Sequence, residues 1–240
     1  MAENSSLETL LQQHQPYHPV VPFDAATDKL QRFDFSQSNT ELSEDIFNDT
    51  QRFSHYIQTK LQASGARYGI GGYGEHRTIY QRSALFSEAA PAGGEAGEPR
   101  RFHLGIDIWG KPLTPVRAPL FGVVHSFAFN HAYGDYGGTI ILSHRLEDHS
   151  FFTLYGHLSL NSLRDLREGQ QMERGDVFAE FGIPQENGNW PPHLHFQIIK
   201  NLQGRSGDYP GVCAFSERAA WLANCPDPDL ILQLMPFARE

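Results

Sequence analysis

Apolar positions change their spacing about a third of the way along the chain. Within residues 43–61, Phe53, Ile57 and Leu61 recur at helical spacing, and Gly65 follows where a helix would end. Ser5 and Ser6 precede a shorter apolar run that also favours a capped helix. We therefore predict a partly helical N-terminal extension at residues 1–80.

The rest of the chain has the pattern of short β-strands. Segments rich in Val, Ile, Phe and Thr are bounded mostly by Gly, Asn, Asp or Pro, and few helical patterns interrupt them. Such a succession predicts a mainly β fold, a compact antiparallel β-sheet domain at residues 81–240. The four clearest strands are expected at residues 122–129, 138–144, 151–157 and 193–199.

Composition and charge exclude several classes of protein. The chain has 240 residues, 40% hydrophobic and 20% charged, which is typical of a globular protein. A net charge of −9 argues against a nucleic-acid partner, because binding phosphates requires clustered Lys and Arg. No apolar run is long enough for a membrane span, and no secretory signal pattern opens the sequence, so we expect a cytoplasmic protein. Residues 87–99 form a low-complexity segment that we expect to be a loop.

Two cysteines, Cys213 and Cys225, are too few for a disulfide framework. Buried thiols and a single bridge between them are both compatible with the sequence.

The first chemical motif is a histidine followed four residues later by an aspartate, His103 and Asp107. On one strand, these two side chains and Gly105 would share a face, and the glycine would leave room for a metal ion. Imidazole nitrogen and carboxylate oxygen are both zinc ligands. When the pair is considered alone, a surface salt bridge is the simpler explanation.

A second motif places His193 and His195 two positions apart, after paired prolines that favour a strand start. The intervening Leu194 and the following Phe196 would face the core, so both histidines share the other face. Burying two unpaired imidazoles would be costly, which favours a metal-binding or catalytic role. The spacing does not tell which of the two binds metal.

The third motif adds His157, which would share a strand face with Thr153 and Tyr155. Alone it would be an ordinary strand residue. Together, the motifs supply four histidines and one aspartate. A hydrolytic zinc site needs three protein ligands and an open position, so two residues remain to assist catalysis.

At this point the chain resembles the lysostaphin-type (LytM-like) zinc endopeptidases. Their pattern is a HxxxD pair, a later single histidine and a closing HxH, and it matches roughly residues 100–200. The resemblance extends to Pro115-Val-Arg-Ala-Pro119, to Tyr155-Gly-His-Leu-Ser159 and to Arg174-Gly-Asp176.

The resemblance implies a role for each motif residue. His103, Asp107 and His195 would bind Zn²⁺, and His157 and His193 would be the catalytic histidines that bind no metal. A zinc-activated water would hydrolyse a peptide bond, in peptidoglycan-type or other short peptides.

Residues beside the site depart from the family pattern. Gln197 replaces a usual glutamate, and Trp190 lies in an altered stretch before the HxH motif. The sequence around Trp190 and Gln197 resembles that of a subgroup whose domains occur fused to class III aminotransferase-like domains. Tyr155 and Trp190 are candidates for substrate contact, with core packing the alternative for Tyr155. A cytoplasmic amidase or dipeptidase of the same mechanism, and a non-catalytic zinc-containing binding module, are the competing functions.

Two features of the extension remain open. Glu75 and Arg77 could reach the groove or form a structural salt bridge, and the first 80 residues could cover the site as a gate.

Overall fold

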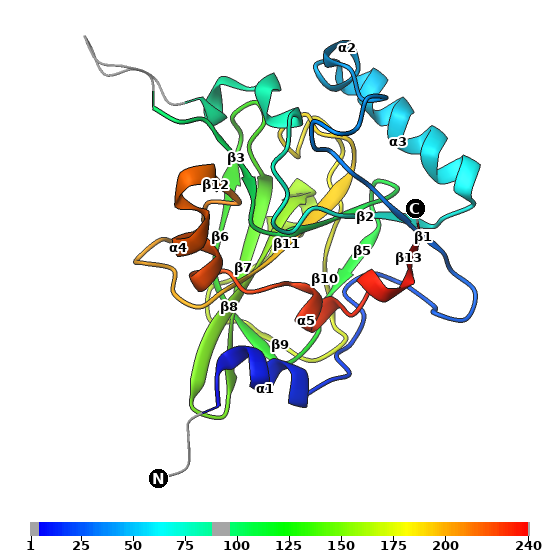
Figure 1. Ribbon diagram of the computed structural model, residues 1–240. Helices are drawn as coiled ribbons and strands as arrows, with labels where there is room; N and C mark the ends of the chain where they lie inside the picture. Colours follow the sequence, from blue (N-terminus) through cyan, green and yellow to red (C-terminus); the bar gives the residue numbers. More distant parts are fainter. Residues whose placement is uncertain (1–4, 88–96, 240) are drawn as a thin grey trace.

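One large sheet runs through the centre of the computed structural model (Figure 1). The structure describes residues 5–87 and 97–239, so most of the predicted low-complexity loop lies outside the described residues. Within these ranges the sheet has nine strands in the order β13-β1-β2-β4-β11-β8-β7-β6-β9. Two small sheets, β10-β5 and β12-β3, flank it. The strands are β1 (Leu30–Arg32), β2 (Tyr68–Gly71), β3 (Arg100–His103), β4 (Ile106–Trp109), β5 (Pro115–Arg117), β6 (Gly122–Asn130), β7 (Gly137–Leu146), β8 (His149–Leu158), β9 (Gln171–Met172), β10 (Val177–Glu180), β11 (His193–Ile199), β12 (Val212–Ala214) and β13 (Ala238–Arg239).

The predicted mainly β, antiparallel fold is confirmed. From β2 to β9 every neighbouring pair in the large sheet is antiparallel, and only β1 pairs in parallel, with β2 and β13. The helices are short apart from α3. They are α1 (Leu7–Gln13), α2 (Glu44–Phe47), α3 (Thr50–Ser64), α4 (Arg218–Asn224) and α5 (Asp229–Leu232), with 3₁₀ helices η1 (Ile79–Arg82), η2 (Ala84–Phe86), η3 (Leu160–Leu163), η4 (Phe215–Glu217) and η5 (Met235–Phe237).

The longest helix, α3, begins and ends where its sequence indicates. The Asp49 side chain accepts hydrogen bonds from the backbone N–H groups of Gln51 and Arg52, so it caps the N-terminus. Gly65 ends the helix in the left-handed conformation at φ 64°. Phe53 and Ile57 are buried in an aromatic cluster that also contains Trp109 of β4. The extension is thereby packed directly onto the central sheet.

The N-terminal extension also joins the sheet through its backbone. β2 pairs with β4 in a register that sets Gly71 opposite Asp107. The expected boundary after residue 80 falls inside η1, which lies against the site described below. Residues 5–80 thus contribute strands to the central sheet and side chains to two hydrophobic clusters that also contain later residues.

Two sequence questions are answered by the described residues. Cys213 and Cys225 are both free and buried, so they are thiols rather than a bridge. Among the helices of residues 5–87 and 97–239, none is long and apolar enough to cross a membrane.

Candidate metal centre

Side chains from two distant parts of the sequence meet at the central sheet. His103, Asp107 and His195 each offer a ligand atom, and these atoms lie within 4.8 Å of one another. His103 Nε2 is 2.9 Å from His195 Nδ1 and 3.4 Å from Asp107 Oδ1, and the last two atoms are 3.1 Å apart. Tetrahedral zinc with bonds of about 2.0–2.1 Å would space its ligands by roughly 3.4 Å. The cluster therefore has the dimensions of a zinc site, slightly contracted.

The geometry behind the HxxxD pair differs from the single strand that we predicted. His103 ends β3, which pairs with β12, whereas Asp107 belongs to β4, which pairs with β11. The chain bends between them at Leu104 and Gly105. A Cβ atom on Gly105 would lie 2.6 Å from His195 Nε2, so the glycine makes room for an imidazole ring rather than for the ion. Cross-strand register then brings His195 opposite Asp107.

Hydrogen bonds on the outer side of each histidine fix its tautomer. His103 Nδ1 donates to the Gly72 carbonyl at 3.0 Å, which leaves Nε2 with a lone pair. His195 Nε2 donates to Gln197 Oε1 at 2.9 Å, which leaves Nδ1 free. The Gln197 amide nitrogen faces Pro210 O and Cys225 Sγ, so its oxygen must face the histidine. Two imidazole lone pairs and one carboxylate oxygen thus converge with no proton between them.

Burial and neighbouring charges together set the charge states of His103 and Asp107. Burial lowers the pKa of His103 to about 3, with Arg77 adding to the shift. Burial works to raise the pKa of Asp107, but His103 and Arg77 hold it well below its ordinary value. At neutral pH the buried His103 is therefore a neutral imidazole and Asp107 a carboxylate, and together with the imidazole of His195 they form a donor set that suits Zn²⁺.

The other two histidines of the motifs lie next to the cluster. The ring centroids of His157 and His193 are 4.0 Å apart, and His193 stacks on Trp109 at 3.8 Å. His157 Nδ1 donates to Asn187 O at 2.9 Å, and His193 Nδ1 donates to Pro191 O at 2.7 Å. Both rings line a cavity and keep Nε2 as a proton acceptor. Burial lowers the pKa of His193 to about 4 and that of His157 well below its ordinary value.

Strand alternation, which we predicted would put His157 on the same face as Tyr155, does not explain the position of His157. Tyr155 faces the hydrophobic core, where its ring packs on Phe196, and strict alternation would send His157 to the same side. The backbone at His157 has φ 64°, in the left-handed region, and this interrupts the alternation. The imidazole therefore lies beside His193, on the side of the sheet opposite Tyr155.

Of the two candidates for substrate contact, Trp190 borders the cavity and Tyr155 does not. Trp190 lines the cavity, with its indole N–H donating to Gly134 O at 3.0 Å. Tyr155 is fully buried in the core and is not among the cavity residues, so core packing, the alternative considered for it, describes its position. The cavity has a volume of about 190 Å³.

Sequence reasoning missed Tyr136, which approaches two of the histidines. Its ring centroid lies 5.1 Å from that of His195 and 5.4 Å from that of His157, and its hydroxyl is 3.4 Å from His195 Nε2. Burial raises its pKa well above the ordinary value, so the hydroxyl stays protonated. The one sequence signal was an aromatic residue among glycines, which is too common to identify a site.

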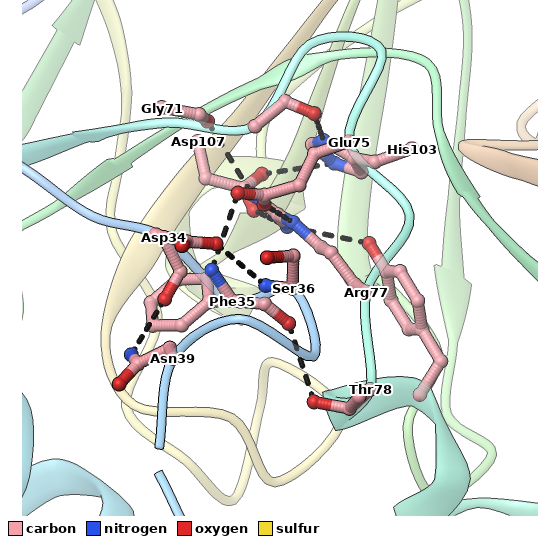
Figure 2. Close-up of polar contacts among 12 residues, drawn as sticks. Asp34, Phe35, Ser36, Asn39, Gly71, Glu75, Arg77, Thr78, His103 and Asp107 are labelled. Atoms are coloured by element: carbon pink, nitrogen blue, oxygen red, sulfur yellow. Dashed lines mark hydrogen bonds and ion pairs between the residues drawn. The ribbon is translucent and has the colours of Figure 1, made fainter. Parts of the chain in front are cut away.

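Glu75 and Arg77 fulfil both alternatives that the sequence left open. They form an ion pair with each other, with Arg77 Nε 2.6 Å from Glu75 Oε2. Arg77 also reaches the candidate metal centre, where its Nη1 donates to Asp107 Oδ2 (Figure 2).

Comparison with known proteins agrees with this arrangement. The model of peptidase family M23 matches residues 101–207, which include His103, Asp107, His157, His193 and His195. The chain is 29% identical over 145 residues to an L-Ala--D-Glu endopeptidase of Bacillus subtilis, covering 56% of this chain and 41% of that protein. It is 33% identical over 103 residues to the DD-carboxypeptidase/endopeptidase Mpg of Neisseria meningitidis serogroup B, covering 43% of this chain and 21% of that protein. The chain thus spans less than half the length of these curated relatives.

Among solved structures, the catalytic domain of lysostaphin from Staphylococcus simulans matches with a TM-score of 0.37 and 19% identity. The match covers 70% of this chain and 96% of that domain. The expected resemblance is confirmed at the level of the domain, whereas a fusion to aminotransferase-like domains stays a prediction. Residues 101–207, with their histidine and aspartate motifs, form a LytM-like domain of peptidase family M23.

Proposed function

We propose that the chain is a zinc-dependent peptidase in which His103, Asp107 and His195 hold the metal. The observation that carries this proposal is the convergence of two imidazole lone pairs and a carboxylate oxygen at one buried point. Three acceptors that face one another repel unless a cation lies between them. Zn²⁺ held by these three residues would satisfy all of them and would keep a coordination position for water or substrate.

The remaining side chains are placed to move protons. Zinc bound here would lower the pKa of a water molecule and polarise a substrate carbonyl. His157 and His193 are neutral, so either Nε2 can accept a proton from the attacking water. The imidazolium formed in this way can stabilise the oxyanion and pass the same proton to the leaving amine, directly or through the neighbouring imidazole, whose ring centroid is 4.0 Å away. Stacking on Trp109 and the bond to Pro191 O hold His193 in one orientation for this work.

We propose a short peptide, of the peptidoglycan type or another, as substrate. Two curated relatives are named as an L-Ala--D-Glu endopeptidase and as a DD-carboxypeptidase/endopeptidase. The aromatic side chains of Trp190, Tyr80 and Tyr136 border the cavity and can pack against a peptide backbone.

A second candidate is an amidase or dipeptidase acting on small molecules in the cytoplasm. The cavity volume of about 190 Å³ favours a small-molecule substrate. One side of the cavity is formed by Tyr80, Leu85 and Phe86, which precede the residues that match the family. Cleavage of free dipeptides but not of sacculi, together with cytoplasmic fractionation, would support this candidate. Cleavage of intact sacculi by a protein found outside the cytoplasm would exclude it.

The first test is zinc content per chain. We expect about one equivalent in the wild type and almost none in His103→Ala or His195→Ala, because each loses one of three ligands. A correctly folded wild type that stays metal-free after zinc addition would refute the metal site and favour a non-catalytic binding module.

The second test separates catalysis from metal binding. His157→Ala should keep its zinc and lose hydrolysis by about 10²–10⁴-fold, as is typical when a general acid or base is removed. His125→Ala is the matched control, because His125 lies on β6 and does not border the cavity. Turnover of His157→Ala at the wild-type rate would remove His157 from the mechanism.

A further inference from the structure

The most unusual group near the candidate metal centre is the guanidinium of Arg77, which is contributed by the N-terminal extension. Its side chain is 1% exposed, yet it carries a charge. A buried charge needs both ionic and hydrogen-bonding partners. Arg77 has Asp107 on one side and Glu75 on the other, and Nη2 donates to Gly71 O at 3.3 Å (Figure 2).

Local backbone structure explains how Arg77 reaches Asp107. β2 pairs with β4, and the chain leaves β2 through Gly71 and Gly72, beside Asp107. At Gly72 φ is 106°, and a Cβ atom would lie 1.7 Å from Arg77 Nη2 and 2.9 Å from His103 Nδ1. A side chain at this position would therefore displace both groups. Gly72 also accepts the hydrogen bond that fixes the tautomer of His103.

Arg77 is itself held in place from the other side. Glu75 Oε2 binds Arg77 Nε at 2.6 Å, and Glu75 Oε1 accepts the backbone N–H of Phe35 at 3.2 Å. The guanidinium also lies over the Phe35 ring, 5.3 Å from its centroid. These contacts lock the planar fork of the arginine in a single orientation toward Asp107.

The contact divides the two oxygens of Asp107 between two partners. Oδ1 faces His103 and His195, whereas Oδ2 accepts from Arg77. A carboxylate without such a donor can bind a metal through both oxygens, which would take up the coordination position needed for water or substrate. Resting on the metal site proposed above, we infer that Arg77 is a positioning residue that restricts Asp107 to single-oxygen ligation of the metal.

This role can be measured on the full chain with metal ions alone. We compare the wild type with Arg77→Met in zinc competition against a chelator, and in visible absorption after Co²⁺ addition. Arg77→Met should bind zinc about 10–100-fold more weakly, the usual effect of removing a group that orients a ligand. Its Co²⁺ complex should absorb more weakly than that of the wild type, because absorption falls as cobalt changes from four to five ligands.

Arg82, the last residue of η1, provides the matched control. It is also buried, but its hydrogen-bond partners are Tyr133, Thr50 and Asn189 rather than a metal ligand. Arg82→Met should keep the wild-type affinity and spectrum. Weakening by Arg82→Met to the same extent as by Arg77→Met would mean that loss of any buried arginine disturbs the site, and would overturn the inference.

A conservative variant, Arg77→Lys, keeps the inference testable if Arg77→Met does not fold. Lysine keeps the charge but has no planar fork with which to bind Asp107 and Glu75 together. Arg77→Lys should therefore fold, and its zinc affinity should lie between those of the wild type and Arg77→Met, or at least several-fold below the wild type. Wild-type affinity and an unchanged Co²⁺ spectrum in the folded Arg77 variants would overturn the inference. A wild type that binds neither ion would instead refute the metal site itself.

Discussion

Gln197 orients His195 by accepting a hydrogen bond from its Nε2. Replacing Gln197 by methionine tests how much this contact contributes to the site. The side chain is fully buried, with Oε1 accepting from His195 Nε2 at 2.9 Å. Its amide nitrogen donates to Pro210 O at 3.3 Å and to Cys225 Sγ at 3.2 Å. Methionine has a similar length and volume, so Gln197→Met removes polar contacts while leaving little cavity.

The expected magnitude follows from the groups that lose a partner. The His195 N–H and the Pro210 carbonyl would each be buried without their present bond, at about 1–3 kcal/mol apiece. The Tyr136 hydroxyl, 3.4 Å from His195 Nε2, can recover part of the first loss. We therefore expect the free energy of unfolding of the metal-free protein to fall by about 2–4 kcal/mol. Zinc affinity should fall about 10–100-fold, because His195 is no longer held in one tautomer.

Two measurements give these quantities separately. Denaturant unfolding in the presence of a chelator reports the stability of the metal-free chain, and chelator competition reports zinc affinity. Gln171→Met on β9 is the control, because Gln171 is exposed and its replacement should change stability by less than about 0.5 kcal/mol. If Gln197→Met unfolds with the wild-type midpoint and binds zinc with the wild-type affinity, the proposed support of His195 is refuted.

Two further predictions concern a close contact and a buried histidine. Gly105→Ala would bring a Cβ atom within 2.5 Å of His195 Cε1 and 2.8 Å of the Phe196 carbonyl, so zinc content should fall well below one equivalent; full loading by metal analysis would contradict this. Burial lowers the pKa of His144 to about 4, so between pH 6.5 and 4 the folded state binds fewer protons than the unfolded chain. Stability from this group is therefore complete above pH 6.5 and is lost as the pH falls toward 4, by up to about 3 kcal/mol. In His144→Phe the slope of unfolding free energy against pH should be shallower over this range. An unchanged slope would mean that groups other than His144 cause the loss of stability at low pH.

The sequence predicted those features that depend on local periodicity. Alternation along β11 correctly put His193 and His195 on one face, with Leu194 and Phe196 in the core. It could not reveal the break between β3 and β4, because His103 and Asp107 meet through two different strand partners. Nor could it reveal the left-handed backbone at His157, since histidine carries no glycine-like signal for positive φ.

Contacts across long sequence separations were beyond prediction from patterns alone. Arg77 reaches Asp107 only because β2 pairs with β4, and neither strand specifies its partner. From the sequence we predict an extension that could gate the site, and in the structure residues 68–86 contribute a strand of the sheet and a wall of the cavity.

The pairing of β2 with β4 has a practical consequence for recombinant work. A fragment cut to residues 101–207, the portion that matches the family, would lack β2 and leave the N–H and C=O groups of Ile106–Trp109 without their partner on that side. An unprotected edge of this kind, which carries the buried apolar side chains of Ile106, Ile108 and Trp109, is a template for pairing between chains. Such a fragment should form aggregates at concentrations at which the full chain stays dispersed, and expression boundaries should therefore begin upstream of β1.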